Sequence, residues 1–410
     1  MENSFLKQIF RGDKVLWTLY GALVVISLFV TFSALTSLSL RVDSTAGPIA
    51  GHWMTIIIGL VLICLIQMSS FRLIQIVGLL LFLLGLGGVF YVMMKGGGIG
   101  GAARHTSFGQ PSELLMLGLI LACAGVFNKM SHNRKLEERY FYYVTAFVML
   151  CVVLILVDNL STAALATIAI FSMMIASHIQ LKRIVAVLLV AFACLALFMS
   201  ISYIFDESKF NAFAEEYPIV KVARRSYTWK GRVTRFVEEK KNEKDNGGEK
   251  KEEYVIDLAN PQVADAKIAI CRGGWFPNGP SSSQQRYHLA EAYSDYIFSI
   301  AAEEGGFLLG TIIMLLYVGV FWRAVMIIQK EQKMYRILLV TGCAVLIVTQ
   351  AAVHIAVSVG AIPVTGQPLP LISKGGSSVV VISACFGIIA RVSAAQQSPL
   401  PTSSATPTPE

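Results

Sequence analysis

The sequence predicts an all-α polytopic membrane protein with ten transmembrane helices. Of its 410 residues, 55% are hydrophobic and only 15% are charged, and the mean hydropathy is +0.63. Soluble globular proteins lie far from this composition. Ten mostly apolar runs can be read along the chain, and runs of about 18 residues or more are long enough to cross the hydrocarbon core as helices. Lys and Arg also gather in alternate short loops, as topology requires.

The ten runs divide into two groups of spans. The first five are Val15 to Leu40, His52 to Met68, Phe71 to Met94, Glu113 to Phe127 with its flanks, and Tyr140 to Val157. The second five are Ser161 to Ser177, Ile184 to Phe205, Asp295 to Ile328, Arg336 to Gly360, and Ser377 to Ala395. The first run is too long for a signal-peptide core and lacks a small-residue cleavage site, so we expect a retained anchor.

Loop charges predict that both termini are cytoplasmic, because Lys and Arg stay on that side of the membrane. The cytoplasmic segments would hold Lys7, Arg11, Lys14, Arg72, Lys129, Arg134, Lys135, Arg139, Lys182, Arg183, Arg323, Lys330, Lys333, Arg336 and Arg391. The short outer loops would hold only Arg41, Lys95, Arg104 and Lys374. The net charge of +8 is then mainly a topology signal, and no nucleic-acid partner is needed.

The predicted domain organisation is a ten-helix membrane domain over 1–395, with one large extracytoplasmic loop over 206–291 and a disordered cytoplasmic tail over 396–410. Within the loop, the basic and aromatic stretch 210–236 suits either an anionic headgroup surface or a solvated face. The charged, low-complexity stretch 238–253 predicts a disordered insertion. Of seven cysteines, only Cys271 falls in this loop, so no disulfide or cysteine metal site is predicted.

Polar residues collect at the predicted outer ends of three spans. Arg104, Gln110, Ser112 and Glu113 precede or open the fourth span; Arg272, Arg286, Glu291 and Asp295 surround the start of the eighth; Lys374, Ser377 and Ser378 surround the start of the tenth. Ionisable groups in a membrane generally face a protein interior or a hydrated cavity. The three loops therefore predict one polar cavity at the outer face.

The eighth span carries three carboxylates. Helical spacing places Glu291, Asp295, Ser299, Ala302 and Gly306 on one stripe. Asp295 is either a functional group or simply an acidic residue favoured in a first helical turn. Glu303 and Glu304 lie deeper, and they either line the cavity or bind Arg and backbone amides between helices as structural groups.

Four blocks of the sequence resemble the SEDS family of peptidoglycan polymerases, and more closely its FtsW division branch than its RodA elongation branch. The blocks are "GAARHTSFGQPSE" (101–113), "DNLST" (158–162), "GGWFPNGPSSSQQRYHLAEAYSDYIFSIAAEEGG" (273–306) and "GAIPVTGQPLPLISKGGSS" (360–378). The last block is the most specific, and the second matches weakly. Three positions depart from the family pattern: His105 replaces Trp, Met116 replaces Lys, and Lys374 replaces Tyr.

The resemblance implies glycosyl transfer at the outer face of the cytoplasmic membrane during cell division, in which lipid II units are joined into glycan strands at the septum. It assigns the catalytic carboxylate to Asp295, the basic residue before it to Arg286, and the QPSE carboxylate to Glu113. It also implies a class B penicillin-binding protein and other division proteins as partners.

The residues suit this chemistry. Transfer from a pyrophosphate needs one base for the attacking hydroxyl and cations for the leaving group. Asp295 is the candidate base, and Arg104, Arg286 and Lys374 are candidate cations. A bridging divalent ion, Mg or Mn, is compatible with the site, but no metal is readable from the sequence. The expected substrate-binding set is Arg104, His105, Gln110, Ser112, Glu113, Arg286, Glu303, Glu304, Lys374 and Ser377.

Two other functions stay open. Ten spans also suit a flippase for a lipid-linked precursor, although such transporters tend to have two similar halves and a charged site at the midplane, and no internal repeat is evident here. A non-catalytic scaffold that recruits a transpeptidase is the third hypothesis.

Overall fold

The computed structural model describes residues 12–36, 46–94, 110–204, 224–245, 261–289 and 292–397, and all regular structure in these ranges is helical. The helices are α2 (Lys14–Thr36), α3 (Ala46–Met68), α4 (Phe71–Met94), α5 (Pro111–His132), α6 (Arg134–Asp158), α7 (Leu160–Ala176), α8 (Leu181–Ile204), α10 (Arg224–Asp245), α11 (Pro261–Gly273), the short 3-10 helix η4 (Gln285–Tyr287), α12 (Ile297–Lys330), α13 (Met334–Ser358) and α14 (Gly376–Gln397).

Eight of these described helices, α2 to α6 and α12 to α14, are long and apolar enough to cross a membrane. This confirms an all-helical, multi-pass membrane protein. The other two predicted spans form α7, with 17 residues, and α8, with 24. Each predicted run thus corresponds to one helix. The largest differences are at α3, which begins at Ala46 rather than at His52, and at α6, which begins at Arg134 rather than at Tyr140.

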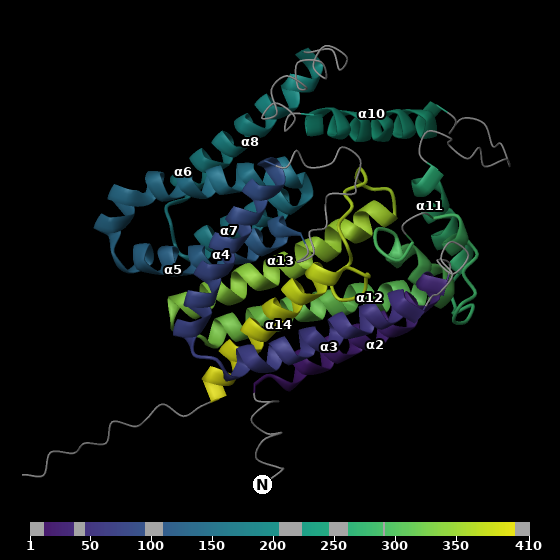
Figure 1. Cartoon of the computed structure of the whole chain (residues 1–410), viewed down its shortest axis with the longest axis horizontal. Coiled ribbons are helices and arrows are strands. Elements are labelled where there is room, and N and C mark those ends of the chain that lie inside the picture. Colours follow the sequence, from purple (N-terminus) through teal and green to yellow (C-terminus); the bar gives the residue numbers. More distant parts are fainter. Residues whose placement is uncertain are drawn as a thin grey trace, which may run out of the picture.

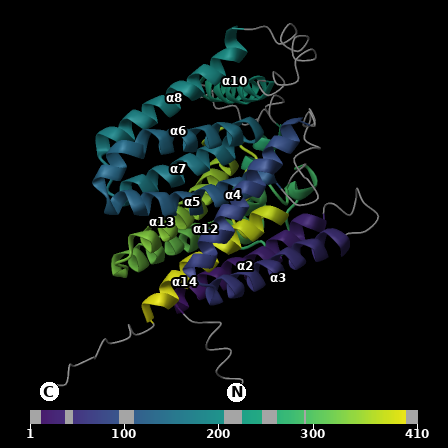
Figure 2. The same cartoon turned by 60° about the vertical axis from the view of Figure 1, so that its left-hand side comes forward.

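The core of the bundle is built around α14. In the most apolar 18-residue stretch of α14, 83% of the residues are buried. The corresponding share is 61% in α5 and α13 and 22% in α3. Figures 1 and 2 show α14 (yellow) between the pair α2 and α3 and the neighbouring α13. The outer helices α3 and α4 expose large apolar side chains such as Ile57 and Leu84, as helices in contact with lipid do.

Opposite ends of the bundle have different chemistry. At one end, which we call the clasp end, polar side chains join helix termini that are distant in the sequence. Asp13 pairs with Arg323, Glu137 with Arg183 at 2.9 Å, Arg391 Nε donates to the Ser69 carbonyl, and Gln397 bonds the Gly12 backbone. The other end, where α5, α7, α12 and α14 begin, we call the site end.

The region between α8 and α12 is more ordered than the sequence predicts. The insertion expected to be disordered over 238–253 is helical from Glu238 to Asp245, the last part of α10, and its remainder lies outside the described residues. Glu and Lys are good helix formers even in a polar segment, which accounts for the difference. A second helix, α11, which we did not predict, follows at Pro261. Likewise α14 reaches Gln397, inside the predicted tail; residues 398–410 lie outside the described ranges.

The start of α12 requires a correction. We expected Asp295 to lie on a helical stripe with Ser299, but α12 begins at Ile297, with Tyr296 as its N-cap, and Asp295 lies in the preceding turn. The carbonyls of Tyr293 and Ser294 accept hydrogen bonds from the segment before α14. These tertiary bonds hold the backbone in a turn in place of a first helical turn.

Candidate active site

The four sequence blocks come together at the site end. The backbone N–H of Gln110, before α5, donates to the Ser377 hydroxyl at the start of α14 (3.3 Å). At the start of α7, Ser161 donates to the Thr365 carbonyl, and Gln367 donates to the Thr162 hydroxyl. The starts of α5, α7 and α14 therefore lie together at the site end.

A non-helical segment, residues 361–375, forms the centre of this region; we call it the proline-rich segment because it contains Pro363, Pro368 and Pro370. Irregular backbone at membrane depth needs its polar groups satisfied by protein. Side chains from four helices of the bundle, α2, α7, α12 and α13, and from α10 do this. The donors are Arg232 to Val364 O, Ser161 to Thr365 O, His354 to Gln367 O, Gln350 to Pro368 O, Tyr317 to Pro370 O, and both Ser27 and Thr31 to Ile372 O.

Asp295 is half-buried in the turn before α12, and Ser294 Oγ donates to its Oδ1 at 3.1 Å. This turn is attached to the proline-rich segment by two bonds. The Lys374 N–H donates to the Tyr293 carbonyl at 3.0 Å, and the Ser373 hydroxyl donates to the Ser294 carbonyl at 2.7 Å. Lys374 Nζ also lies 5.1 Å from the centre of the Tyr293 ring. The proposed base and the unusual lysine therefore stand on directly bonded segments.

Glu113 and Ser112 in the first turn of α5 are both buried. The Glu113 Oε2 atom and the Ser112 hydroxyl have no hydrogen-bond partner among the described residues. Buried polar atoms are normally satisfied by protein, water or ligand. This first turn can therefore accept a hydrogen bond from a hydroxyl or amide of a bound molecule.

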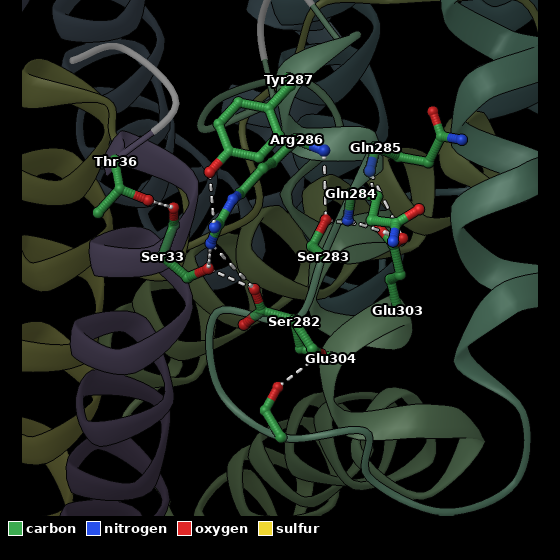
Figure 3. Close-up of polar contacts among 11 residues, drawn as sticks. Ser33, Thr36, Ser282, Ser283, Gln284, Gln285, Arg286, Tyr287, Glu303 and Glu304 are labelled. Atoms are coloured by element: carbon green, nitrogen blue, oxygen red, sulfur yellow. Dashed lines mark hydrogen bonds and ion pairs between the residues drawn. The ribbon is translucent and has the colours of Figure 1, made fainter. Parts of the chain in front are cut away.

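Glu303 and Glu304 anchor a second irregular segment, residues 274–289 between α11 and α12, which we call the strap (Figure 3). The Glu303 carboxylate accepts from the Ser283 hydroxyl and from the N–H groups of Gln284 (3.1 Å) and Gln285 (3.3 Å). Both glutamates are buried, 4% and 6% exposed. Of the two roles left open for them, binding of backbone amides and Arg is the one with contacts in the structure.

Arg286 belongs to the same network. Its Nη1 lies 3.9 Å from Glu304 Oε1 and donates to Ser33 Oγ on α2 at 2.9 Å, and Ser33 in turn donates to Glu304. Its Nη2 donates to the Tyr287 hydroxyl. Arg286, one of the three candidate cations, is therefore bound by partners inside the protein, as Figure 3 shows.

A break in α12 explains how the strap reaches the two glutamates. Gly306 has φ +67°, a value that disfavours residues with a Cβ, and a Cβ there would come within 2.6 Å of the Phe276 carbonyl. The helical bonds across this point are replaced by bonds to the strap. Phe307 N–H donates to the Gly274 carbonyl, and the N–H groups of Asn278 and Gly279 donate to the Glu304 carbonyl.

Three helices, α5, α7 and α14, begin at the site end beside the proline-rich segment. Helix N-termini carry partial positive charge and free N–H groups, and they favour bound anions. With Lys374, they make this region suitable for a phosphate group. No cluster of three His, Cys, Asp or Glu side chains that could hold a metal occurs in the described ranges.

Not every residue predicted for the site can be placed, and the sequence did not point to every polar residue of the site end. Arg104, His105 and Glu291 lie outside the described residues. The sequence analysis missed five donors that bind the proline-rich segment: Ser27, Thr31, Tyr317, Gln350 and His354. Two of these pairs, Ser27 with Thr31 and Gln350 with His354, are spaced by four residues inside apolar spans, and that spacing was the available signal.

Comparisons with known proteins agree with this arrangement. Residues 13–398 match the model of the family FTSW_RODA_SPOVE, described as cell cycle protein. Among curated relatives, a probable peptidoglycan glycosyltransferase FtsW of Thioalkalivibrio is 35% identical over 150 residues, 36% of this chain and 38% of the relative. The stage V sporulation protein E of Bacillus subtilis is 36% identical over 133 residues, 32% of this chain and 36% of the relative. These alignments thus span little more than a third of the curated relatives.

Solved structures share the fold over almost the full length. One, described as "Structural coordination of polymerization and crosslinking by a peptidoglycan synthase complex", has a TM-score of 0.66 at 22% identity and covers 95% of this chain and 99% of that chain. The rod shape-determining protein RodA of Thermus thermophilus has a TM-score of 0.61 at 20% identity, with 95% and 98% covered. On the family match, the chain belongs to the FtsW, RodA and SpoVE family of cell cycle proteins.

Proposed function

We propose that this protein is a peptidoglycan glycosyltransferase that polymerises lipid II at the outer face of the cytoplasmic membrane during cell division. The observation that carries the proposal is the attachment of the Asp295 turn to the Lys374 segment, beside the first turns of α5 and α14. The curated relatives named as glycosyltransferases support the same activity.

In the proposed mechanism, Asp295 acts as general base. The hydroxyl oxygen of one sugar attacks the anomeric carbon of the next, its proton passes to the Asp295 carboxylate, and the bond to the diphosphate oxygen breaks with its electron pair. A positioned base contributes roughly 10² to 10⁴ in rate. Lys374 and the helix N-termini stabilise the leaving diphosphate.

A divalent cation, Mg or Mn, would have to be shared with the substrate. The described residues offer no three-ligand cluster for it, and Mg²⁺ is usually held by one or two carboxylates together with substrate phosphates. Such an ion would add charge stabilisation of the leaving group. The roles of Asp295 and Lys374 do not depend on it.

We infer ten spans by counting α7 and α8, with both termini cytoplasmic and the site end in the periplasm. The clasp end carries the cations assigned to the cytoplasm, among them Arg183, Arg323 and Arg391. Residues 206–291, which include α10 and α11, then form the large periplasmic loop. A class B penicillin-binding protein is the proposed partner, and the septum the proposed location.

The clasp end also favours a polymerase over a flippase. A flippase must open alternately toward both sides, and the pairs Asp13 with Arg323 and Gln397 with Gly12 close the cytoplasmic end around the buried helix α14. Ser112 and Glu113, two of the buried groups with unfilled hydrogen-bonding capacity, lie at the opposite end. A one-sided site suits a reaction at one membrane surface.

The test is lipid II polymerisation by the purified chain with a class B penicillin-binding protein. Asp295→Asn should lower the rate by at least about 100-fold, whereas Asp265→Asn, a half-buried carboxylate on α11, should leave it unchanged. Equal polymer from Asp295→Asn and wild type would remove Asp295 as base. Lipid movement across vesicles without polymer would instead support the flippase, and partner recruitment without either activity would support the scaffold.

A further inference from the structure

Two polar side chains on α13, one helical turn apart, face the proline-rich segment from inside the bundle. Gln350 and His354 are 3% and 1% exposed, and neither belongs to the site residues predicted from the sequence. Polar groups this deep in a membrane protein are expensive and usually serve a specific contact. Both bond to residues next to each other in the chain, Pro368 and Gln367.

Gln350 joins the two sides of the stretch that carries Lys374. Its Nε2 atom donates to the Pro368 carbonyl at 2.9 Å and to the Ser378 hydroxyl at 3.2 Å. A side-chain amide has two N–H donors on one nitrogen, and both are used here. Because Lys374 lies between these two acceptors in the sequence, Gln350 fixes the path of the loop on either side of it.

His354 extends the contact to α7. Its Nδ1 lies 2.8 Å from the Gln367 carbonyl, which can only accept, so this nitrogen carries the hydrogen. The Gln367 side chain then donates to Thr162 Oγ1 in the first turn of α7. One residue of the proline-rich segment is therefore held between α13 and α7.

We propose that Gln350 and His354 are positioning residues, which hold the proline-rich segment so that Lys374 and Ser377 keep their places beside Asp295 and Glu113. They act through the segment and do not touch the reacting atoms. The link to Asp295 is the pair of bonds from Lys374 to Tyr293 and from Ser373 to Ser294. The catalytic part of this proposal rests on the proposed function, whereas the structural part does not.

The test uses the full-length protein and two measurements. The first is hydrogen exchange of the peptide 361–375, and the second is kcat and KM for lipid II polymerisation with the partner transpeptidase. Gln350→Met keeps the side-chain length and removes both donors, and His354→Leu removes the donor to Gln367. His354→Asn retains an amide N–H near the position of Nδ1 and serves as the conservative rescue.

In Gln350→Met and His354→Leu, we expect exchange in 361–375 to accelerate by about tenfold or more, the change for one or two lost hydrogen bonds. We expect kcat to fall by a similar factor with KM little changed, because the misplaced cation acts on the leaving group in the transition state. His354→Asn should stay near wild type in both measurements. Thr341→Val on the same helix removes a hydroxyl that bonds only to the Ile337 carbonyl, and should change neither.

Unchanged exchange in 361–375 with wild-type kcat in Gln350→Met would overturn the proposal. So would faster exchange spread evenly over all helices, since that indicates general destabilisation. If the wild-type protein makes no polymer, the proposed function fails, while the exchange comparison still decides whether the two residues hold the segment. A higher KM with unchanged kcat would assign the two residues to substrate binding and would contradict a positioning role.

Discussion

The strap and the proline-rich segment are both irregular, and both lie at the site end, yet they are anchored by opposite chemistry. The strap offers backbone N–H groups, and buried carboxylates accept from them: Gln284 and Gln285 bond to Glu303. The proline-rich segment offers carbonyls, and donors that are neutral apart from Arg232, such as Tyr317 and Gln350, bond to them.

The difference follows from the sequences of the two segments. Proline has no N–H, so a segment with three prolines has an excess of acceptors and needs hydroxyl, amide and imidazole donors. The strap has the reverse need and takes carboxylates, whose buried charge is balanced by Arg286. The two deep glutamates of α12, Glu303 and Glu304, are thus explained by their contacts with the strap. Asp295, by contrast, lies in the turn before α12 that is bonded to the segment carrying Lys374.

We expect the largest effect from replacing Arg286, whose positive charge balances the buried carboxylates that anchor the strap. Arg286→Met leaves Glu304 buried, with Ser33 as its remaining side-chain donor, and removing one partner of a buried ion pair destabilises by about 3–5 kcal/mol. The free energy of unfolding in detergent would measure this. The double variant Arg286→Met with Glu304→Gln should recover part of the loss.

Arg272 supplies a control for that measurement. It is exposed, and its side chain donates to the Gln284 side chain, so Arg272→Met should change stability by no more than about 0.5 kcal/mol. An Arg286→Met variant as stable as Arg272→Met would mean that the strap is not held by charge.

Removing the second carboxylate ranks next. Glu303→Leu leaves the Ser283 hydroxyl and two backbone N–H groups without their acceptor, and we expect a loss of about 3 kcal/mol, because hydrogen bonds to charged groups contribute about 1.5–3 kcal/mol each. Thr311→Val, also on α12, removes a hydroxyl that bonds only the Phe307 carbonyl and is the matched control. Thermal unfolding followed by size exclusion would compare the two, and equal midpoints would contradict the anchoring role.

The bend that brings the strap to α12 is the third target. At Gly306, alanine would combine the left-handed conformation, which disfavours a Cβ by roughly 1–2 kcal/mol, with a contact of 2.6 Å to the Phe276 carbonyl. We expect a total loss of about 2–3 kcal/mol. Gly87→Ala on α4 has nothing within 4 Å of the added Cβ, so it should be neutral or stabilise by up to about 1 kcal/mol. A Gly306→Ala protein with unchanged stability would show that the bend can straighten.

The sequence predicted the bundle well because each span is a long apolar run, and it predicted which loops meet because charge and motif pattern both marked one face. It could not predict what each polar side chain binds. Helical spacing predicts which face of α12 carries Glu303. The strap that covers this face has irregular backbone around Asn278, and helical spacing does not predict the path of such backbone. Asp295 was misplaced onto the helix for a related reason, since the bonds that hold its turn come from residues 373 and 374, nearly 80 positions away.

The smallest expected effect tests the neutral side of the comparison. Tyr317 donates to the Pro370 carbonyl at 2.6 Å, and Tyr317→Phe should destabilise by about 1–2 kcal/mol, because the buried acceptor loses its partner. Tyr335 on α13 is the control, since its hydroxyl is buried without a hydrogen-bond partner in the described part of the chain, and Tyr335→Phe should be neutral or slightly stabilising. Unfolding free energies of the two variants would separate a lost hydrogen bond from a lost hydroxyl, and equal values would mean that the proline-rich segment does not depend on this donor.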